Sequence, residues 1–137
     1  SPQGTDVLFQ KPSLEATFGG AEANVARLAR QLRRRGGFCY GSADNPIADA
    51  AVRELRGFGV ETKYIRRSGD RVGIYYAEKG ACMRPSKVVY DRAHSSITEV
   101  KPGDFDWKAI FDGAAWFHTT GITPAVAEGT AEVSLRR

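Results

Sequence analysis

The first regular pattern in the chain is an apolar repeat at three- and four-residue steps, which is typical of an amphipathic helix. The repeating positions are Val25, Leu28, Ala29 and Leu32. They lie on one face of the predicted helix. Gly36-Gly37 follows, and we expect the helix to end there in a left-handed turn, which glycine adopts without steric cost.

A second helix is predicted to begin at Asp44-Asn45-Pro46. An Asp or Asn oxygen can accept a hydrogen bond from an unpaired amide of the first turn, and proline at the first helical position loses no hydrogen bond. The expected apolar stripe consists of Ile47, Ala51, Leu55 and Phe58. Gly57 and Gly59 predict the end of this helix.

After Val60 the apolar spacing changes to two, which predicts strands at 62–66, 72–78 and 87–92. The last two are joined by a loop that contains glycine and proline. Further short strands are expected at 7–9, 38–40 and 114–119, and helices at 104–113 and after the turn 121–124. Helices and strands thus alternate near both ends, with consecutive strands between them. This order favours an α/β core with a small β-sheet insertion.

Size and composition fit one globular domain over residues 1–137, with 42% apolar and 26% charged residues. The two cysteines are too few for a disulfide framework and lack the spacing of a zinc site. No apolar run reaches the roughly 18 residues of a membrane span. The first six residues also lack the basic start and apolar stretch of a signal peptide. We therefore expect a cytoplasmic protein without a membrane partner.

The net charge of +4 is unevenly distributed, because no acidic residue lies between Glu22 and Asp44. The arginines in this interval are Arg27, Arg30, Arg33, Arg34 and Arg35. Such a cluster can bind phosphates or nucleic acid. No aromatic residues interleave with these arginines to provide a stacking surface, so we favour a solvated helix face over a nucleic-acid site. A polyanion-binding module remains the alternative.

Residues 19–24 read Gly-Gly-Ala-Glu-Ala-Asn and lead directly into the first predicted helix. Glycines allow a ligand to approach the backbone closely, and a helix start presents unpaired amides. Asn24, one turn further on, could donate to and accept from a hydroxyl. The stretch has neither the lysine of a phosphate-binding P-loop nor the glycine spacing of a dinucleotide site. A simple tight turn into the helix is the alternative interpretation.

A second candidate lies at Tyr90-Asp91-Arg92, at the end of a predicted strand. Strand alternation places Tyr90 and Arg92 on one face and Asp91 on the other. A guanidinium suits a carboxylate or a phosphate, and tyrosine adds a hydroxyl and an apolar surface. Tyr75 could lie beside them on the neighbouring strand. The alternative is an ordinary sheet surface with an extended arginine.

The remaining reactive side chains predict no catalytic nucleophile and no metal site. His94 and His118 have no second ligand at a useful spacing; we expect His118 to be buried in its strand and His94 to lie at the surface. Neither cysteine has an activating base nearby in the sequence.

Taken together in order, these motifs resemble the ribokinase-like (PfkB) carbohydrate kinases. Residues 18–26 closely resemble that family's first signature, and residues 44–51 with Leu55 and Gly59-Val60 resemble its next helix and turn. Residues 84–93 and 116–125 are similar to the 2-keto-3-deoxygluconate kinase subgroup. The resemblance extends from about residue 1 to residue 135 and covers the N-terminal portion of the family only.

The resemblance implies part of a doubly wound α/β sheet with a small β-sheet lid, whose strands would lie within about 62–92. It also implies transfer of a phosphoryl group from ATP, with Mg²⁺, to a sugar-acid hydroxyl. Gly19, Gly20 and Asn24 would contact sugar hydroxyls. Tyr75, Tyr90 and Arg92 would hold the keto-acid end, with Ile122 lining the pocket. Homo-oligomers through the lid strands are a further implication.

The chain departs from the family in lacking its Gly-Ala-Gly-Asp motif, and with it the catalytic aspartate. The nearest string, Pro102-Gly103-Asp104, lies in the wrong region. The nucleotide-binding half and the usual first strand are also missing. We therefore expect the substrate side of a sugar-acid kinase, inactive by itself and without its own catalytic, ATP or Mg²⁺ site. A kinase fragment for fructose or ribose, or a non-catalytic sugar-acid-binding module, are the alternatives.

Overall fold

The computed structural model describes residues 6–10 and 13–135. These residues form two compact units. The smaller unit comprises the segment up to Phe18 together with Gly73–Ala93, and the larger comprises Gly19–Val72 together with the chain from His94 onward. No helix among the described residues is both long and apolar enough to cross a membrane.

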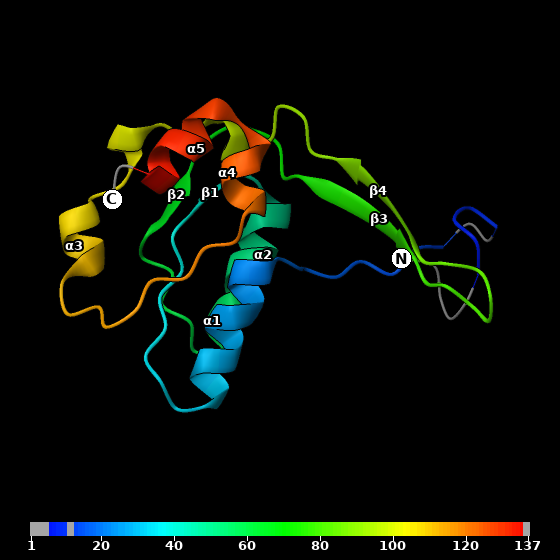
Figure 1. Ribbon diagram of the computed structural model, residues 1–137, viewed down its shortest axis with the longest axis horizontal. Coiled ribbons are helices and arrows are strands. Elements are labelled where there is room, and N and C mark those ends of the chain that lie inside the picture. Colours follow the sequence, from blue (N-terminus) through cyan, green and yellow to red (C-terminus); the bar gives the residue numbers. More distant parts are fainter. Residues whose placement is uncertain (1–5, 11–12, 136–137) are drawn as a thin grey trace. The chain divides into compact units, whose positions relative to one another are not determined.

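The larger unit mixes helices with a short parallel sheet (Figure 1). Its elements are α1 (Ala21–Gln31), β1 (Tyr40–Ser42), α2 (Pro46–Gly57), β2 (Ile65–Arg67), η1 (Ser96–Glu99), η2 (Pro102–Asp104), α3 (Trp107–Phe111), α4 (Ile122–Val126) and α5 (Glu128–Leu135). Strands β1 and β2 pair in parallel, with Gly41 opposite Arg66, and α2 connects them. This β-α-β arrangement confirms the predicted α/β class.

Helix α2 begins where the sequence predicts. The Asn45 side-chain oxygen accepts a hydrogen bond of 2.9 Å from the Ala48 amide, and its amide nitrogen donates to the Asp70 carbonyl at 2.8 Å. Gly59 has a φ of 76°, the left-handed conformation expected just past the helix. The predicted stripe is partly wrong, however, because Ile47 is 59% exposed. The buried residues of α2 are instead Ala48, which directly follows Ile47, and Val52, which lies one turn after Ala48.

Helix α1 also forms as predicted but ends earlier than Gly36-Gly37. The Arg34 amide donates a hydrogen bond to the Ala29 carbonyl and closes the last turn. Arg33, directly before Arg34, has a positive φ of 57°. This closing turn therefore uses an arginine where glycine is usual. Gly36 instead lies against the helix, since an added Cβ would come within 3.3 Å of the Ala26 carbonyl oxygen. Its role is close packing, and the predicted left-handed exit at this pair is wrong.

The apolar face of α1 is exposed in the part of the chain that the structure describes. Leu28 is 53% and Leu32 66% accessible, and Val25 is also exposed. Only Ala26 is buried in this helix. The described residues therefore leave this apolar face uncovered.

The core of the larger unit lies where β1 meets η1 and α5. Gly41 in β1 has no room for a side chain, because an added Cβ would clash with the Val100 side chain. Gly129 in α5 is equally close to the Val100 carbonyl. Val100, Ser95 and Ser96 are all almost fully buried. Three segments distant in sequence thus meet at Val100.

Two strands predicted in this unit lie elsewhere along the chain than expected. The strand expected at 38–40 is shifted to Tyr40–Ser42, although the Phe38 amide still bonds the Glu61 carbonyl. The strand expected at 62–66 is Ile65–Arg67, and it pairs with β1. It is therefore part of the α/β sheet, and assigning it to the lid was wrong. The parallel partner lies about 25 residues upstream, which local alternation does not reveal.

The predicted strand at 114–119 pairs with no strand in the described parts of the chain. Trp116 is 84% exposed and His118 is exposed, so the expected burial of His118 is also wrong. An apolar run forms a strand only where a neighbouring strand accepts its hydrogen bonds. The helix expected at 104–113 is likewise shorter, because the Asp106 side chain caps α3 and accepts from the Ala109 amide at 3.1 Å.

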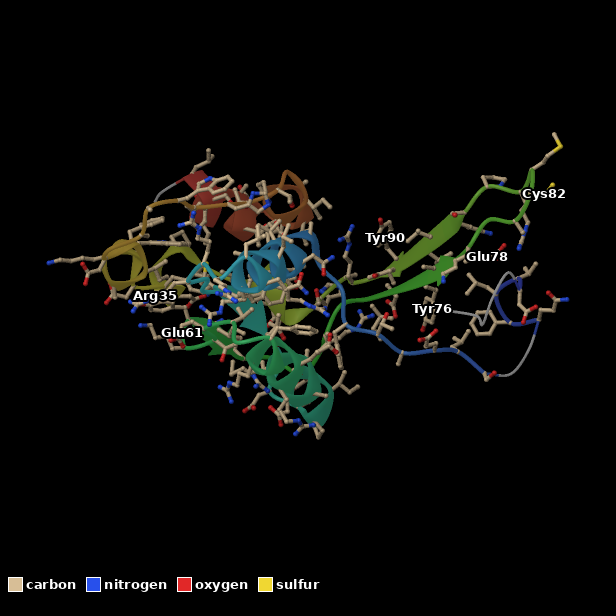
Figure 2. All side chains as sticks on the ribbon, turned by 90° about the horizontal axis from the view of Figure 1, so that it is seen from below. Arg35, Glu61, Tyr76, Glu78, Cys82 and Tyr90 are labelled. Carbon is tan, nitrogen blue, oxygen red and sulfur yellow. The ribbon has the colours of Figure 1, made fainter. Side chains whose placement is uncertain are left out.

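The smaller unit is built on an antiparallel ribbon of β3 (Ile74–Glu78) and β4 (Lys87–Asp91). Both predicted strands are confirmed, and Figure 2 shows Cys82 at the tip of their connection. Residues 7–9 form a turn rather than the predicted strand, with Phe9 at a φ of 62°. The turn packs on the ribbon, since the Phe9 and Tyr76 rings lie 6.2 Å apart. The Leu8 amide donates to the Glu78 carboxylate, which also pairs with Arg84.

Candidate functional site

The glycine stretch forms a sharp entry into α1. Gly20 has a φ of 155°, a conformation that side-chain-bearing residues rarely adopt. Its carbonyl accepts a hydrogen bond of 2.9 Å from the Asn24 amide and so closes the first turn. Gly20 has no side chain with which to cap the helix, so it satisfies none of the unpaired amides in the first turn of α1. Gly19 and Gly20 are both exposed, so a ligand can reach this backbone.

Asn24 lies on the first turn of α1 and is exposed. Its side chain makes no hydrogen bond with any residue that the structure describes. An uncommitted carboxamide offers both donors and an acceptor to a ligand. Asn24 is therefore available for the hydroxyl contacts predicted from the sequence.

Ile122 is the first residue of α4 and is 52% exposed. Gly121, before it, has an ordinary right-handed conformation, with φ −66° and ψ −10°. An added Cβ there would meet nothing within 4 Å. The exposed side chain of Ile122 presents an apolar surface at the start of this helix.

A residue that the sequence analysis did not identify connects these two segments. The Glu22 oxygen Oε1 accepts hydrogen bonds from the Thr120 amide at 3.1 Å, the Thr120 hydroxyl at 2.6 Å and the Thr123 hydroxyl at 2.8 Å. Burial alone would raise the pKa of this carboxyl, but the hydrogen bonds from Thr120, its own amide and Thr123 together lower it below the usual glutamate value. The partners lie about a hundred residues apart, so local sequence patterns could not have revealed them.

In the smaller unit, Tyr75 and Tyr90 are directly opposite each other on β3 and β4. Their ring centroids are 6.4 Å apart and the rings are tilted by 49°. The Arg92 guanidinium carbon lies 4.2 Å from the Tyr90 ring centroid, in cation–π geometry. The two tyrosines and the arginine are thus brought together on one ribbon.

Both tyrosines on this side of the ribbon are exposed. Tyr75 is 47% and Tyr90 59% accessible. The opposite side carries Tyr76 and Glu78, on which the turn at residues 7–10 packs. Figure 2 shows Tyr76 and Tyr90 on opposite sides of the ribbon. Within the smaller unit, the side with Tyr75 and Tyr90 can receive a ligand carboxylate on the guanidinium and an apolar portion on the rings.

The structure thus brings the predicted site residues together in two groups, one in each unit. Gly19, Gly20, Asn24 and Ile122 belong to the larger unit, and Tyr75, Tyr90 and Arg92 belong to the smaller one.

The histidines and cysteines belong to neither of these two groups. No group of three or more His, Cys, Asp or Glu residues in the described parts of the chain could hold a metal ion. His94 is exposed, as expected. Burial raises the pKa of the Cys39 thiol, which disfavours the nucleophilic thiolate.

The arginine cluster is partly engaged in structural contacts. Arg27 forms an ion pair of 3.1 Å with Glu54 and lies 3.9 Å above the centre of the Phe58 ring. Arg30 donates to the Arg34 carbonyl at 3.1 Å. The Arg27 contacts join α1 to α2, and the Arg30 contact lies at the end of α1 itself; both support the interpretation of the cluster as a helix surface.

Comparisons with known proteins agree with the observed fold. The chain is 40% identical over 135 residues to a 2-dehydro-3-deoxygalactonokinase of Haloferax volcanii, covering 98% of this chain and 42% of that protein. It is 50% identical to the crystal structure of a 2-dehydro-3-deoxygluconokinase from Thermotoga maritima, with a TM-score of 0.95 over 98% of this chain and 41% of that one. A PfkB family carbohydrate kinase from Listeria grayi is 36% identical, with a TM-score of 0.82 over 86% of this chain and 37% of that one. No protein-family model matches the chain.

The fold and these matches confirm the class predicted from the motifs: the chain corresponds to the N-terminal portion of the ribokinase-like, or PfkB, carbohydrate kinases. Within that class, the matches at 40% and 50% identity are both named as kinases of 2-keto-3-deoxy sugar acids. The chain spans about two-fifths of the length of each relative.

Proposed function

We propose that this chain is the substrate-side portion of a kinase that phosphorylates a 2-keto-3-deoxy sugar acid, with 2-keto-3-deoxygluconate as the preferred substrate. The main support is the group of Tyr75, Tyr90 and Arg92, in which a half-buried guanidinium lies against an exposed tyrosine ring and could pair with a carboxylate while the rings contact the adjoining carbons. The two sugar-acid kinases at 40% and 50% identity support the same substrate class.

Arg92 would pair with the carboxylate, while the hydroxyls of Tyr75 and Tyr90 would contact the keto-acid end. The backbone at Gly19 and Gly20, with the Asn24 carboxamide, would bind sugar hydroxyls. Ile122 would supply an apolar wall.

Phosphoryl transfer depends on positioning and on neutralising charge around the transferred group. ATP supplies that group and Mg²⁺ neutralises its charge when both are bound. The sequence has no Gly-Ala-Gly-Asp motif, so the proposal gives neither ligand a site among these residues. We propose that the chain alone binds the acceptor but does not transfer phosphate.

The remaining parts of the proposal concern location and assembly. We propose a cytoplasmic enzyme, because both cysteines are free thiols. The β3–β4 ribbon exposes Ile74, Val88 and Val89, which makes it a candidate surface for pairing with a second copy.

Calorimetry with the isolated chain tests the substrate class. We expect 2-keto-3-deoxygluconate to bind and fructose and ribose not to bind, because a neutral sugar gives Arg92 no carboxylate. Arg92→Ala should abolish binding of the acid. Equal affinity for neutral sugars would favour a fructose- or ribose-type kinase instead.

A coupled ATPase assay tests the expected lack of turnover, and phosphorylation by the isolated chain would refute that part. Salt-sensitive retention on DNA, without sugar-acid binding, would favour the polyanion-binding module.

A further inference from the structure

Glu22 connects two segments that carry proposed substrate contacts. It lies on the first turn of α1, between Gly20 and Asn24. Its partners Thr120 and Thr123 are 98 and 101 residues away in sequence. All these residues belong to the larger unit, so their arrangement is defined by one compact body.

The geometry concentrates three donors on one carboxylate oxygen. The Thr120 amide and hydroxyl and the Thr123 hydroxyl all donate to Glu22 Oε1. Hydrogen bonds to an ionised acceptor are roughly twice as strong as neutral ones. The negative charge also lies at the N-terminus of an eleven-residue helix, where the helix dipole stabilises it. This connection is therefore strongest when Glu22 is ionised.

The two threonines flank Ile122 at positions 120 and 123, so the carboxylate fixes the start of α4. The Thr120 hydroxyl oxygen also lies 3.4 Å from the Ile122 amide, which donates to it. Within the described residues, the side-chain hydrogen bonds of Thr120 and Thr123 to α1 are both made to Glu22. The carboxylate is thus well placed to hold the Ile122 segment against the glycine entry.

We propose that Glu22 is a positioning residue for substrate binding. It holds the segment that carries Ile122 in place relative to the first turn of α1, which carries Gly20 and Asn24. The segment and the turn can then contact the sugar acid without rearranging on binding. This inference rests on the proposed function. The donors of Thr120 and Thr123 all bond Glu22 Oε1, so the proposed role of Glu22 is exerted through these two neighbours.

The test compares Glu22→Ala, which removes the acceptor, with Glu22→Gln, which keeps an acceptor oxygen without the charge. Calorimetry with 2-keto-3-deoxygluconate measures affinity. We expect Glu22→Ala to weaken binding about tenfold or more, and Glu22→Gln to restore most of the loss. Glu128→Gln removes another first-turn acid, on α5, and should change affinity less than about twofold.

Hydrogen exchange of the Thr120 amide, followed by NMR, gives a readout that a general loss of stability would not mimic. Exchange at Thr120 should accelerate in Glu22→Ala, while the Gly41 amide in β1 should keep its protection. Equal acceleration at both amides would mean that Glu22 only stabilises the fold, and would overturn the proposal.

The outcomes separate this proposal from the proposed function. A wild-type chain that binds no sugar acid overturns both. Wild-type binding that is unchanged in Glu22→Ala overturns the role of Glu22 alone. Wild-type binding that is lost in Glu22→Ala and recovered in Glu22→Gln, with faster exchange confined to the Thr120 segment, supports it.

Discussion

Tyr75 and Tyr90 occupy directly opposite positions on β3 and β4, and the Arg92 guanidinium stacks on the Tyr90 ring. The antiparallel pairing fixes which side chains share a side of the ribbon. Arg92 therefore presents its charge beside two rings rather than as an isolated surface cation. This arrangement gives a carboxylated ligand both a charged and an apolar contact.

Replacing Tyr90 by alanine should weaken binding of 2-keto-3-deoxygluconate about tenfold, because it removes the ring on which Arg92 stacks and one wall of the proposed site. Calorimetry measures the affinity. Tyr76→Ala is the matched control, since Tyr76 lies on the opposite side of the ribbon and packs with Phe9. A larger loss of affinity from the Tyr76 variant would contradict this assignment of sides.

Gly41→Ala should destabilise the larger unit by about 1–3 kcal/mol, the usual cost of overpacking a core. The added Cβ would clash with Val100 at the centre of the core. Denaturant unfolding measures the free energy. Gly57→Ala is the control, because a Cβ there meets nothing within 4 Å, and it should be neutral or slightly stabilising. Equal effects of the two substitutions would show that β1 does not pack on Val100 as described.

The Glu22 carboxyl should make stability depend on pH in the acid range. Its pKa is lowered in the folded state, so its contribution is present above the unfolded pKa of about 4.3 and is lost as pH falls through the folded value. The difference in unfolding free energy between wild type and Glu22→Gln should therefore shrink as pH falls from 7 toward 3. A difference that is constant over this range would mean that the carboxyl is not stabilised in its ionised form.

Parts of this structure followed from local sequence signals. The Asn45 cap and Pro46 predicted the start of α2, and period-two spacing predicted β3 and β4 and placed Tyr90 with Arg92. The partner of β2 could not be predicted in this way, because it depends on a parallel pairing with a distant strand. The link from Glu22 to Thr120 escaped detection for the same reason.

The exposure of α1 leads to a prediction about the isolated chain. Leu28 and Leu32 are more than half exposed, so the chain should bind the apolar dye ANS and associate as its concentration rises. Leu28→Gln with Leu32→Gln should reduce dye fluorescence and change the unfolding free energy by no more than about 0.5 kcal/mol per site. Fluorescence and sedimentation measure these effects. A large loss of stability would show that the face is buried in solution.

The central claim is that a 2-keto-3-deoxy sugar acid binds to the tyrosine-bearing side of the ribbon, with its carboxylate on Arg92. An NMR titration of the isotopically labelled chain with 2-keto-3-deoxygluconate tests it directly. We predict that resonances of Tyr90 and Arg92 shift and saturate with one dissociation constant, while those of Tyr76, on the opposite side of the ribbon, change much less. Resonances of Tyr90 and Arg92 that stay in place, or shifts confined to Tyr76, would contradict it.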